Sequence, residues 1–412
     1  MAAADEMARR EREARSLKVL IALPTSSGQL SGVERHAISL ARCLLKRSEI
    51  SQIHLVAAPW QQEFVSASIP REDPRLFLHS ASMKNSSLSR NFWFYNELHR
   101  DATRYGVDVV HVAYPAPINA RKFRSPTVVT LHDLYPYDIP VNFGFPKVLF
   151  NRAALWQCLG AADAIACVSR STYSRLEEMK PEIARKKAHM ISNSVETRGD
   201  GNTSEVVTEA EGVPFLLCVA QHRRNKNALL ALRVFNLLLR EGKLQKDTRL
   251  LIIGRRGPET PVIEAFVGNS GLRDSVVLLH GISDSKLQWS YGNCSLLIAP
   301  SIIEGFGLPV AEGLLAGCRV VCSDIPAFRE IDTRRISTMV SLGSQEEERF
   351  AEAICKSLSE SAPLPIDLPE LSPTVMAERY IRLYRSLLPA QAAIEETDRV
   401  PIVAARGGQY QL

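Results

Sequence analysis

The sequence predicts an α/β protein built from two Rossmann-like domains that face each other across a cleft. In both halves of the chain, short apolar runs alternate with longer amphipathic stretches, a pattern that favours parallel sheets with helices on both faces. The polar segment 197–212, which contains glycines and no aromatic residue, interrupts this alternation and is typical of a linker. The length of 412 residues exceeds the size at which single cores stop growing, so two domains are expected.

The predicted strands can be followed in order along the chain. In the first half they begin at Lys18 and have the sequences KVLIALP, IHLVAA, VDVVHVAY, TVVTLHD, AIACVS and KAHMIS. A helix over 32–46 should follow the first of them. In the second half the strands are PFLLCVA, RLLIIG, SVVLLHG, SLLIAP and RVVCSD, and a helix capped by Asn225 is expected from there to Arg240. Ligands should bind at the carboxyl ends of both sets of strands.

These patterns also set the domain boundaries. The extension at the N-terminus carries nearly balanced charges, and the end of the chain has a loose composition, so neither is expected to join a core. The predicted segments are an extension (1–17), a first domain (18–196), a linker (197–212), a second domain (213–371), a helix opened by Ser372 and Pro373 (372–388) and a tail (389–412).

The composition is that of an ordinary soluble globular protein, with 45% hydrophobic and 23% charged residues. The net charge of +5 is modest for this length and does not indicate a nucleic-acid partner. No apolar run is long enough to span a bilayer, and the N-terminus lacks the apolar region of a signal peptide, so a cytoplasmic location is expected. The eight cysteines are scattered, and Cys318 and Cys322 lack the second pair or histidine of a zinc set. We therefore expect reduced thiols and no metal site.

The segment SIIEGFGLPVAEGLLAG (301–317) carries the strongest functional signal. Glu304 follows the strand SLLIAP, and a helix should begin near Leu308, with Pro309 in its first turn. Glu312 then lies about one turn into that helix. Either glutamate alone could be a solvated residue or a partner of the helix dipole, whereas their joint placement favours a binding site.

The loop between the two glutamates is suited to an anion. Gly305 and Gly307 permit backbone angles closed to other residues and let a ligand approach the main chain. The N-terminus of a helix presents unpaired N–H groups to a phosphate, and carboxylates accept hydrogen bonds from sugar hydroxyls. A phosphorylated sugar is therefore the ligand that this segment favours.

The pattern Glu-x-Phe-Gly-x-x-x-x-Glu, the small-residue helix after it and the following RVVCSDIPAFREI resemble the nucleotide-sugar site of retaining glycosyltransferases with the GT-B fold, specifically family 4. The resemblance implies that Glu304 lies near the donor sugar and that Glu312 holds the ribose. It also implies that the first domain binds the acceptor and that the helix 372–388 crosses back onto this domain. The backbone groups implied to contact the diphosphate are those of Gly305, Phe306, Gly307 and Leu308.

A basic segment, LCVAQHRRNKN, lies at a predicted strand end in the second half of the chain. Cations there would meet a diphosphate together with a helix N-terminus, although a solvated basic turn is an alternative. The family carries an arginine and a lysine here, and the resemblance assigns the lysine to Lys226. The arginine position holds Gln221, so Arg223 or Arg224 would have to supply the missing charge.

In the first domain, the run from Ser31 to Arg35 resembles the family's Gly-Gly-x-Glu loop facing the diphosphate and acceptor, with serine in place of the first glycine. The resemblance implies that His132 contacts a hydroxyl of the donor sugar. The remaining candidates that it implies are Gly32 and Glu34 in this loop, Asp133 beside the histidine, Asn193 before the hinge, and Gly254, Gly281 and Asp284 in the base-binding region. Each of the last three also fits an ordinary βα turn.

The expected function is transfer of a sugar from a nucleoside diphosphate donor to an acceptor hydroxyl, with retention at the anomeric carbon. No two aspartates are separated by one residue, so the Asp-x-Asp metal clamp of the other major glycosyltransferase fold is absent from the sequence. We expect no cofactor beyond the nucleotide-sugar co-substrate, a role in polysaccharide biosynthesis, and a glycan or lipid-linked acceptor, with peripheral contact at the inner face of a membrane left open. An aromatic acceptor surface is one interpretation of Tyr114, Tyr135, Tyr137 and Phe143, and core packing is the other.

Three alternatives stay open at this point. They are a sugar-nucleotide epimerase of the same fold, a glycosidase that uses Glu304 and Glu312 as acid and base, and a non-catalytic partner that binds nucleotide sugars. The substitutions at Gln221 and Ser31 are the features that keep the last one open. The donor sugar, the nucleotide base, the acceptor and the oligomeric state are not encoded in any pattern that we recognise.

Overall fold

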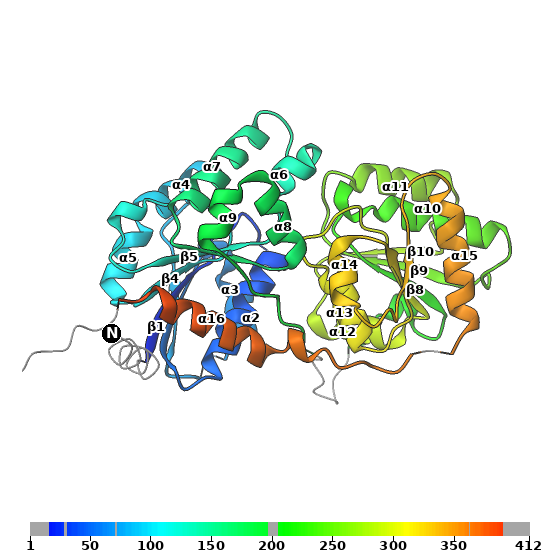
Figure 1. The fold of residues 1–412 in the computed structure, drawn as a ribbon. Coiled ribbons are helices and arrows are strands. Elements are labelled where there is room, and N and C mark those ends of the chain that lie inside the picture. Colours follow the sequence, from blue (N-terminus) through cyan, green and yellow to red (C-terminus); the bar gives the residue numbers. More distant parts are fainter. Residues whose placement is uncertain (1–15, 29–30, 71, 197–204, 362, 390–412) are drawn as a thin grey trace, which may run out of the picture.

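The structure is a computed structural model that describes residues 16–28, 31–70, 72–196, 205–361 and 363–389. It confirms the predicted fold class, because two parallel sheets with helices on both faces lie side by side and form a GT-B arrangement (Figure 1). Most of the predicted extension 1–17, the first half of the predicted linker and nearly all of the predicted tail 389–412 lie outside the described residues.

The first domain contains a seven-stranded parallel sheet in the order β3-β2-β1-β4-β5-β6-β7. Helices α2 and α16 cover one face of the sheet, and α4, α5, α7 and α8 cover the other. The strands are β1 (Leu17–Ala22), β2 (Ile50–Ala57), β3 (Leu76–Ser80), β4 (Val109–Val112), β5 (Thr127–Leu131), β6 (Ala164–Cys167) and β7 (Ala188–Met190). The helices are α2 (Gly32–Leu45), α3 (Gln62–Ser68), α4 (Ser87–Asn96), α5 (Leu98–Tyr105), α6 (Tyr135–Asp138), α7 (Lys147–Ala161), α8 (Arg170–Met179) and α9 (Pro181–Lys187).

The second domain contains a six-stranded parallel sheet in the order β10-β9-β8-β11-β12-β13. Helices α10, α11 and α15 pack on one face, and α12, α13 and α14 pack on the other. The strands are β8 (Phe215–Val219), β9 (Arg249–Ile253), β10 (Val276–Leu279), β11 (Leu296–Ala299), β12 (Val320–Ser323) and β13 (Thr338–Val340). The helices are α10 (Ala228–Arg240), α11 (Thr260–Asn269), α12 (Asp284–Asn293), α13 (Leu308–Leu315), α14 (Pro326–Ile331) and α15 (Glu346–Ser359).

The start of α10 differs from the prediction. A short 3-10 turn, Arg224–Lys226, precedes the helix, and Asn227 occupies the N-cap with a left-handed backbone (φ 51°). Asn225 therefore does not cap α10. Its side-chain oxygen instead accepts a hydrogen bond of 3.0 Å from the Asn142 amide of the first domain. The extra turn presents Lys226 to the cleft between the domains.

Helix α16 (Pro373–Leu387) leaves the second domain and packs on the first, as predicted for the segment 372–388 (Figure 1). Ser372 caps it by accepting a hydrogen bond from the backbone N–H of Val375. Tyr380 and Tyr384 are fully buried, and the Tyr384 hydroxyl lies 2.6 Å from Nδ1 of the buried His111. The C-terminal helix is thus part of the first domain's core.

No helix in the described parts of the chain is long and apolar enough to cross a membrane.

Candidate functional site

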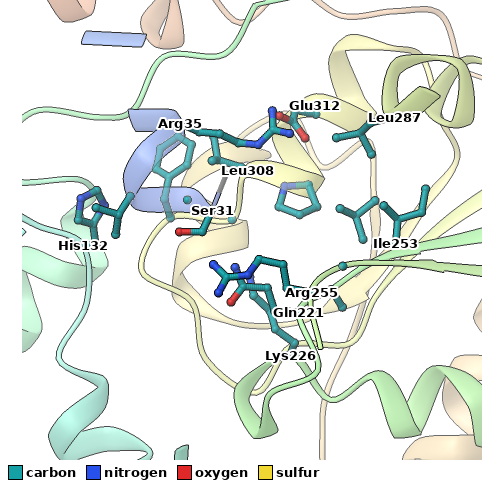
Figure 2. A pocket seen from close by; sticks show the side chains of 18 of the residues that line it. Ser31, Arg35, His132, Gln221, Lys226, Ile253, Arg255, Leu287, Leu308 and Glu312 are labelled. Atoms are coloured by element: carbon teal, nitrogen blue, oxygen red, sulfur yellow. The ribbon is translucent and has the colours of Figure 1, made fainter. Parts of the chain in front are cut away.

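A cavity of about 790 Å³ lies between the two domains and is lined by loops that follow the carboxyl ends of strands in both sheets (Figure 2). The first domain contributes the loop before α2 and the loop after β5. The second domain contributes the loops after β8, β9, β10 and β11. Ligands of open parallel sheets bind at this end, where the chain leaves the strands and the backbone is available for contacts.

Glu304 and Lys226 form an ion pair on the cavity wall. The lysine Nζ lies 2.6 Å and 2.8 Å from the two carboxylate oxygens, and their side chains are only 6% and 18% exposed. The Ser301 hydroxyl donates a hydrogen bond of 2.7 Å to the same carboxylate, and the Tyr135 hydroxyl of the first domain donates another, at 3.4 Å. A carboxylate with so little exposure is stable only when it is paired in this way.

The loop after Glu304 brings the N-terminus of α13 to the cavity, as predicted. Gly307 is the N-cap residue and has φ 105°, in the region that favours glycine. Gly305 must also lack a side chain, because a Cβ there would lie 1.8 Å from the backbone oxygen of His132. Ser169 and Thr172 of the first domain donate hydrogen bonds to the Gly305 carbonyl. Both domains therefore hold the loop that presents the helix terminus.

About one turn into α13, Glu312 lines the cavity, and a buried tyrosine holds its carboxylate. The Tyr291 hydroxyl donates a hydrogen bond of 2.7 Å to Oε2 of Glu312. Burial and the charge of this carboxylate raise the pKa of Tyr291, so the phenol remains a donor. Arg35 of α2 reaches across the cleft toward Glu312 (Figure 2) and forms an ion pair of 2.5 Å with Asp284 of α12. Two carboxylates and a guanidinium thus lie together on this side of the cavity.

The loop after β5 contributes a neutral histidine. Burial lowers the pKa of His132 to about 4. Its Nε2 lies 2.9 Å from the backbone oxygen of Ala113, and a carbonyl only accepts hydrogen bonds, so Nε2 carries the proton. Nδ1 is therefore the unprotonated nitrogen, able to accept a hydrogen bond from a hydroxyl.

The pKa of Asp133, the next residue, is shifted in the opposite direction. Burial raises the pKa of its carboxyl from 3.8 to about 6, although the backbone N–H of Tyr135, at 3.0 Å, and the charge of Arg223 act in the other direction. Arg223 also lines the cavity, which places a cation beside this carboxyl.

The cavity brings together nearly all of the candidates from the sequence. Arg224 lies outside the lining, because its exposed side chain faces Glu259 at 3.9 Å. Glu34 is also outside, since it is buried and accepts a hydrogen bond of 2.9 Å from the Ser31 backbone N–H, which fixes the loop before α2. The candidates that line the cavity are Glu304, Lys226, Arg223, His132, Glu312, Gly305, Phe306, Gly307, Leu308, Gly254, Gly281, Asp284, Gly32, Asp133 and Asn193.

Sequence reasoning missed three side chains at this site. Arg35 was named only as the end of a loop motif, and Tyr135 only as an aromatic surface residue. Arg255 was not named at all, although it directly follows Gly254 in the run LIIGRRGPE. A basic residue immediately after a strand end was the available signal for Arg255. Tyr114 and Tyr137 stay off the cavity wall, the former with its hydroxyl 2.5 Å from the Pro24 carbonyl oxygen.

Among the described residues, no group of three or more His, Cys, Asp and Glu side chains is placed to hold a metal ion. The eight cysteines are free thiols, and most of them are buried.

Comparison with protein families matches both halves of the chain to glycosyltransferases. Residues 30–198 match the family described as Glycosyltransferase Family 4, and residues 201–368 match Glycosyl transferases group 1. The two matches together cover most of the chain, with their boundary inside the predicted linker. The chain therefore belongs to glycosyltransferase family 4.

Individual relatives agree with this assignment. The chain is 28% identical over 206 residues to the O-antigen chain mannosyltransferase RfbU of Salmonella typhimurium. The aligned region is 50% of this chain and 54%, about half, of that relative's length. The chain is 24% identical over 334 residues to the O-antigen chain mannosyltransferase B of Escherichia coli, which covers 76% of this chain and 84% of the relative. Among solved structures, Anabaena Alr3699/HepE in complex with UDP-glucose superimposes with a TM-score of 0.59 at 14% identity, over 91% of this chain and 96% of that one. At this identity the superposition shows a shared fold.

The raised pKa of Asp133 predicts a pH-dependent stability. Between about pH 4 and pH 6 the folded chain retains a proton that the unfolded chain releases, so this carboxyl destabilises the fold as the pH rises through that window. The variant Asp133→Asn keeps an acceptor for the Tyr135 N–H and does not titrate. From pH ~4.5 to pH ~6.5, urea titrations should show the unmodified chain losing about 2 kcal/mol more unfolding free energy than the variant. Parallel pH profiles for the two proteins would contradict the assignment of this pKa.

Proposed function

We propose that the chain is a glycosyltransferase that moves a sugar from a nucleoside diphosphate donor to an acceptor hydroxyl, with retention at the anomeric carbon. The observation that carries this proposal is the Glu304–Lys226 pair beside the N-terminus of α13, inside an inter-domain cavity of a family 4 chain. A carboxylate near the sugar and positive charge near the phosphates are what departure of a nucleoside diphosphate requires.

In the proposed reaction the bond between the anomeric carbon and the diphosphate oxygen breaks first, and negative charge develops on the leaving group. Lys226 and the N–H groups at the start of α13 stabilise that charge, and Glu304 supports the positive charge on the sugar. The acceptor oxygen then bonds to the anomeric carbon on the face that the diphosphate has left. Its proton passes to an oxygen of the departing phosphate, so no group of the protein needs to act as nucleophile.

The remaining walls of the cavity supply donor subsites in this proposal. Glu312, oriented by Tyr291, accepts hydrogen bonds from the ribose hydroxyls. The unprotonated Nδ1 of His132 accepts one from a hydroxyl of the donor sugar. Gly254, Gly281 and Asp284 also line the cavity, and the family resemblance assigns them to the base.

We further propose that the acceptor is a glycan of a bacterial polysaccharide, because the relatives named above are O-antigen chain mannosyltransferases. A lipid-linked form of this acceptor would bring the chain to a membrane. Four exposed apolar side chains lie on the first domain around the start of α7, with the exposed Lys147 among them. These side chains are Val141 (66% exposed), Phe145 (83%), Leu149 (50%) and Phe150 (71%).

The catalytic role of Lys226 predicts a large loss of turnover when its charge is removed. Lys226→Ala and Lys226→Gln should each lower turnover by about a hundredfold or more, measured with the best donor among UDP-, GDP- and ADP-linked hexoses. The glutamine variant keeps a hydrogen-bond donor for Glu304, so it should fold like the unmodified chain. Its melting temperature checks that it does. Lys243→Ala, at an exposed turn after α10, is the matched control. Unchanged turnover in the glutamine variant would refute the role, and absence of any transfer by the unmodified chain would favour a non-catalytic nucleotide-sugar binder.

Transfer should not require a divalent cation, because in this proposal Lys226 and the N–H groups at the start of α13 stabilise the charge of the leaving phosphate. Dialysis against EDTA should leave the transfer rate unchanged, and added Mg²⁺ or Mn²⁺ should not raise it. A rate that falls in EDTA and returns with either ion would rule out the metal-independent scheme while leaving the transferase assignment in place.

The apolar side chains around α7 predict binding to lipid vesicles. The double variant Phe145→Ser/Phe150→Ser should cosediment with anionic phospholipid vesicles at least about tenfold more weakly than the unmodified chain, because each buried phenylalanine contributes roughly 1.5–3 kcal/mol. Leu364→Ser, which changes a side chain that is 83% exposed outside this surface, is the control. Equal sedimentation of all three proteins would exclude this surface as the membrane contact.

A further inference from the structure

The donor cavity lacks an arginine where the family resemblance expects one, at Gln221. Gln221 lines the cavity but carries no charge, and Lys226 is already neutralised by Glu304. A diphosphate brings more than one negative charge into a largely buried site, where uncompensated charge is costly. Another cation should therefore lie near Gln221.

Three arginines near Gln221 could supply this cation, and their side chains lie in different places. Arg224 faces Glu259 outside the cavity. Arg223 lines the cavity, but its charge acts on Asp133 of the first domain, where it opposes the effect of burial on the pKa of that carboxyl. Arg255, at the end of the neighbouring strand, also lines the cavity.

The sheet register places Arg255 beside Gln221. Strands β8 and β9 are parallel neighbours, with Val219 opposite Ile253. The pairing continues past the strand ends, because the backbone N–H of His222 donates to the Arg255 carbonyl at 2.9 Å. The two loops are in close contact, since a Cβ on Gly254 would lie 1.9 Å from the Ala220 backbone oxygen. A guanidinium on either loop can therefore reach the same part of the cavity.

The guanidinium of Arg255 points toward the loop before α2, which by the family resemblance faces the diphosphate. Its Nη1 donates a hydrogen bond of 2.8 Å to the Ser27 hydroxyl, directly before the loop that contains Gly28 and Ser31 on the cavity wall. Figure 2 shows the Arg255 side chain extending toward Ser31, with Gln221 and Lys226 next to it. Within the part of the chain that the structure describes, this guanidinium has a hydroxyl partner and no carboxylate partner. Its charge is therefore available to a ligand, unlike that of Lys226.

We propose that Arg255 binds the diphosphate of the donor and supplies the charge that is absent at Gln221. This inference rests on the proposed function, since it requires a nucleoside diphosphate in the cavity. The charge is thus supplied from the loop after β9 instead of the loop after β8, and the backbone pairing of the two strands holds these positions side by side.

The test measures affinity for UDP, GDP or ADP, whichever raises the melting temperature of the unmodified chain most, and for the matching nucleoside. Arg255→Gln should weaken diphosphate binding about 10- to 100-fold, the range for loss of a hydrogen bond to a charged group, and should leave nucleoside binding unchanged. The double variant Gln221→Arg/Arg255→Gln should recover most of the affinity, because it returns the guanidinium from the adjacent loop. Isothermal titration gives all of these values.

Arg256→Gln is the matched control, since it removes the same charge from the adjacent residue, which is 59% exposed and paired with Glu264 at 2.6 Å. Its affinity should equal that of the unmodified chain. If Arg255→Gln binds the diphosphate with an affinity within about twofold of the unmodified value, the inference about Arg255 is overturned and the proposed function stands. The same conclusion follows if affinity is lost in the variant Arg223→Gln and not in Arg255→Gln. An equal loss for diphosphate and nucleoside would also overturn it, because this would show a structural role. Binding of none of the three diphosphates by the unmodified chain would overturn the proposed function as well.

Discussion

The structure of the cleft depends on the ion pair between Glu304 and Lys226. This carboxylate is buried where the two domains meet, and it needs charge and hydrogen-bond partners from both of them. Glu304 is only 7% exposed, so its charge is tolerated only with close partners. Lys226 and Ser301 come from its own domain, whereas Tyr135 comes from the other. The loops after β5, β8 and β11 are therefore linked through one charge. An incoming anion competes with this carboxylate for the lysine, which makes additional positive charge nearby important to the site.

The loop that presents the α13 terminus is shaped by the first domain as much as by the second. The backbone of His132 passes so close to Gly305 that no side chain fits between them, and two hydroxyl side chains from α8 and the residue before it hold the Gly305 carbonyl. On the same side of the cleft, the Glu330 carboxylate of α14 accepts hydrogen bonds of 2.9 Å from the backbone N–H of Arg170 at the start of α8. A helix of one domain is thus capped by a side chain of the other.

The sequence predicts most of this architecture because buried parallel strands are continuous apolar runs, which periodicity detects directly. Strand β3 has no such run, since it lies at the edge of its sheet and is at most half-buried, and it was not predicted. The helix at Leu308 was predicted because glycine and proline mark its start. The cap of α10 was placed at Asn225 in error, because the left-handed backbone of Asn227 depends on how the preceding turn packs against the first domain.

The site residues show the same difference between local patterns, which the sequence reveals, and long-range contacts, which it does not. Those within one local motif, such as Glu304 and Glu312, could be identified from spacing. Contacts between distant segments could not, because no local pattern relates Arg35 to Asp284, 249 positions later in the chain, or Arg255 to Ser27. The substitute for a missing arginine was therefore sought in the same loop, whereas the sheet offers the adjacent strand as an equivalent position.

The return of α16 to the first domain means that this protein cannot be divided into an N-terminal and a C-terminal half. Met376, Tyr380 and Tyr384 complete the core of the first domain, although the sequence of the second domain separates them from the rest of it. A hybrid enzyme that exchanges donor domains between relatives would have to replace an internal segment and keep this last helix with its host. In recombination terms, the second domain is an insertion into the first, and a single crossover between two such genes would leave both products with an open core.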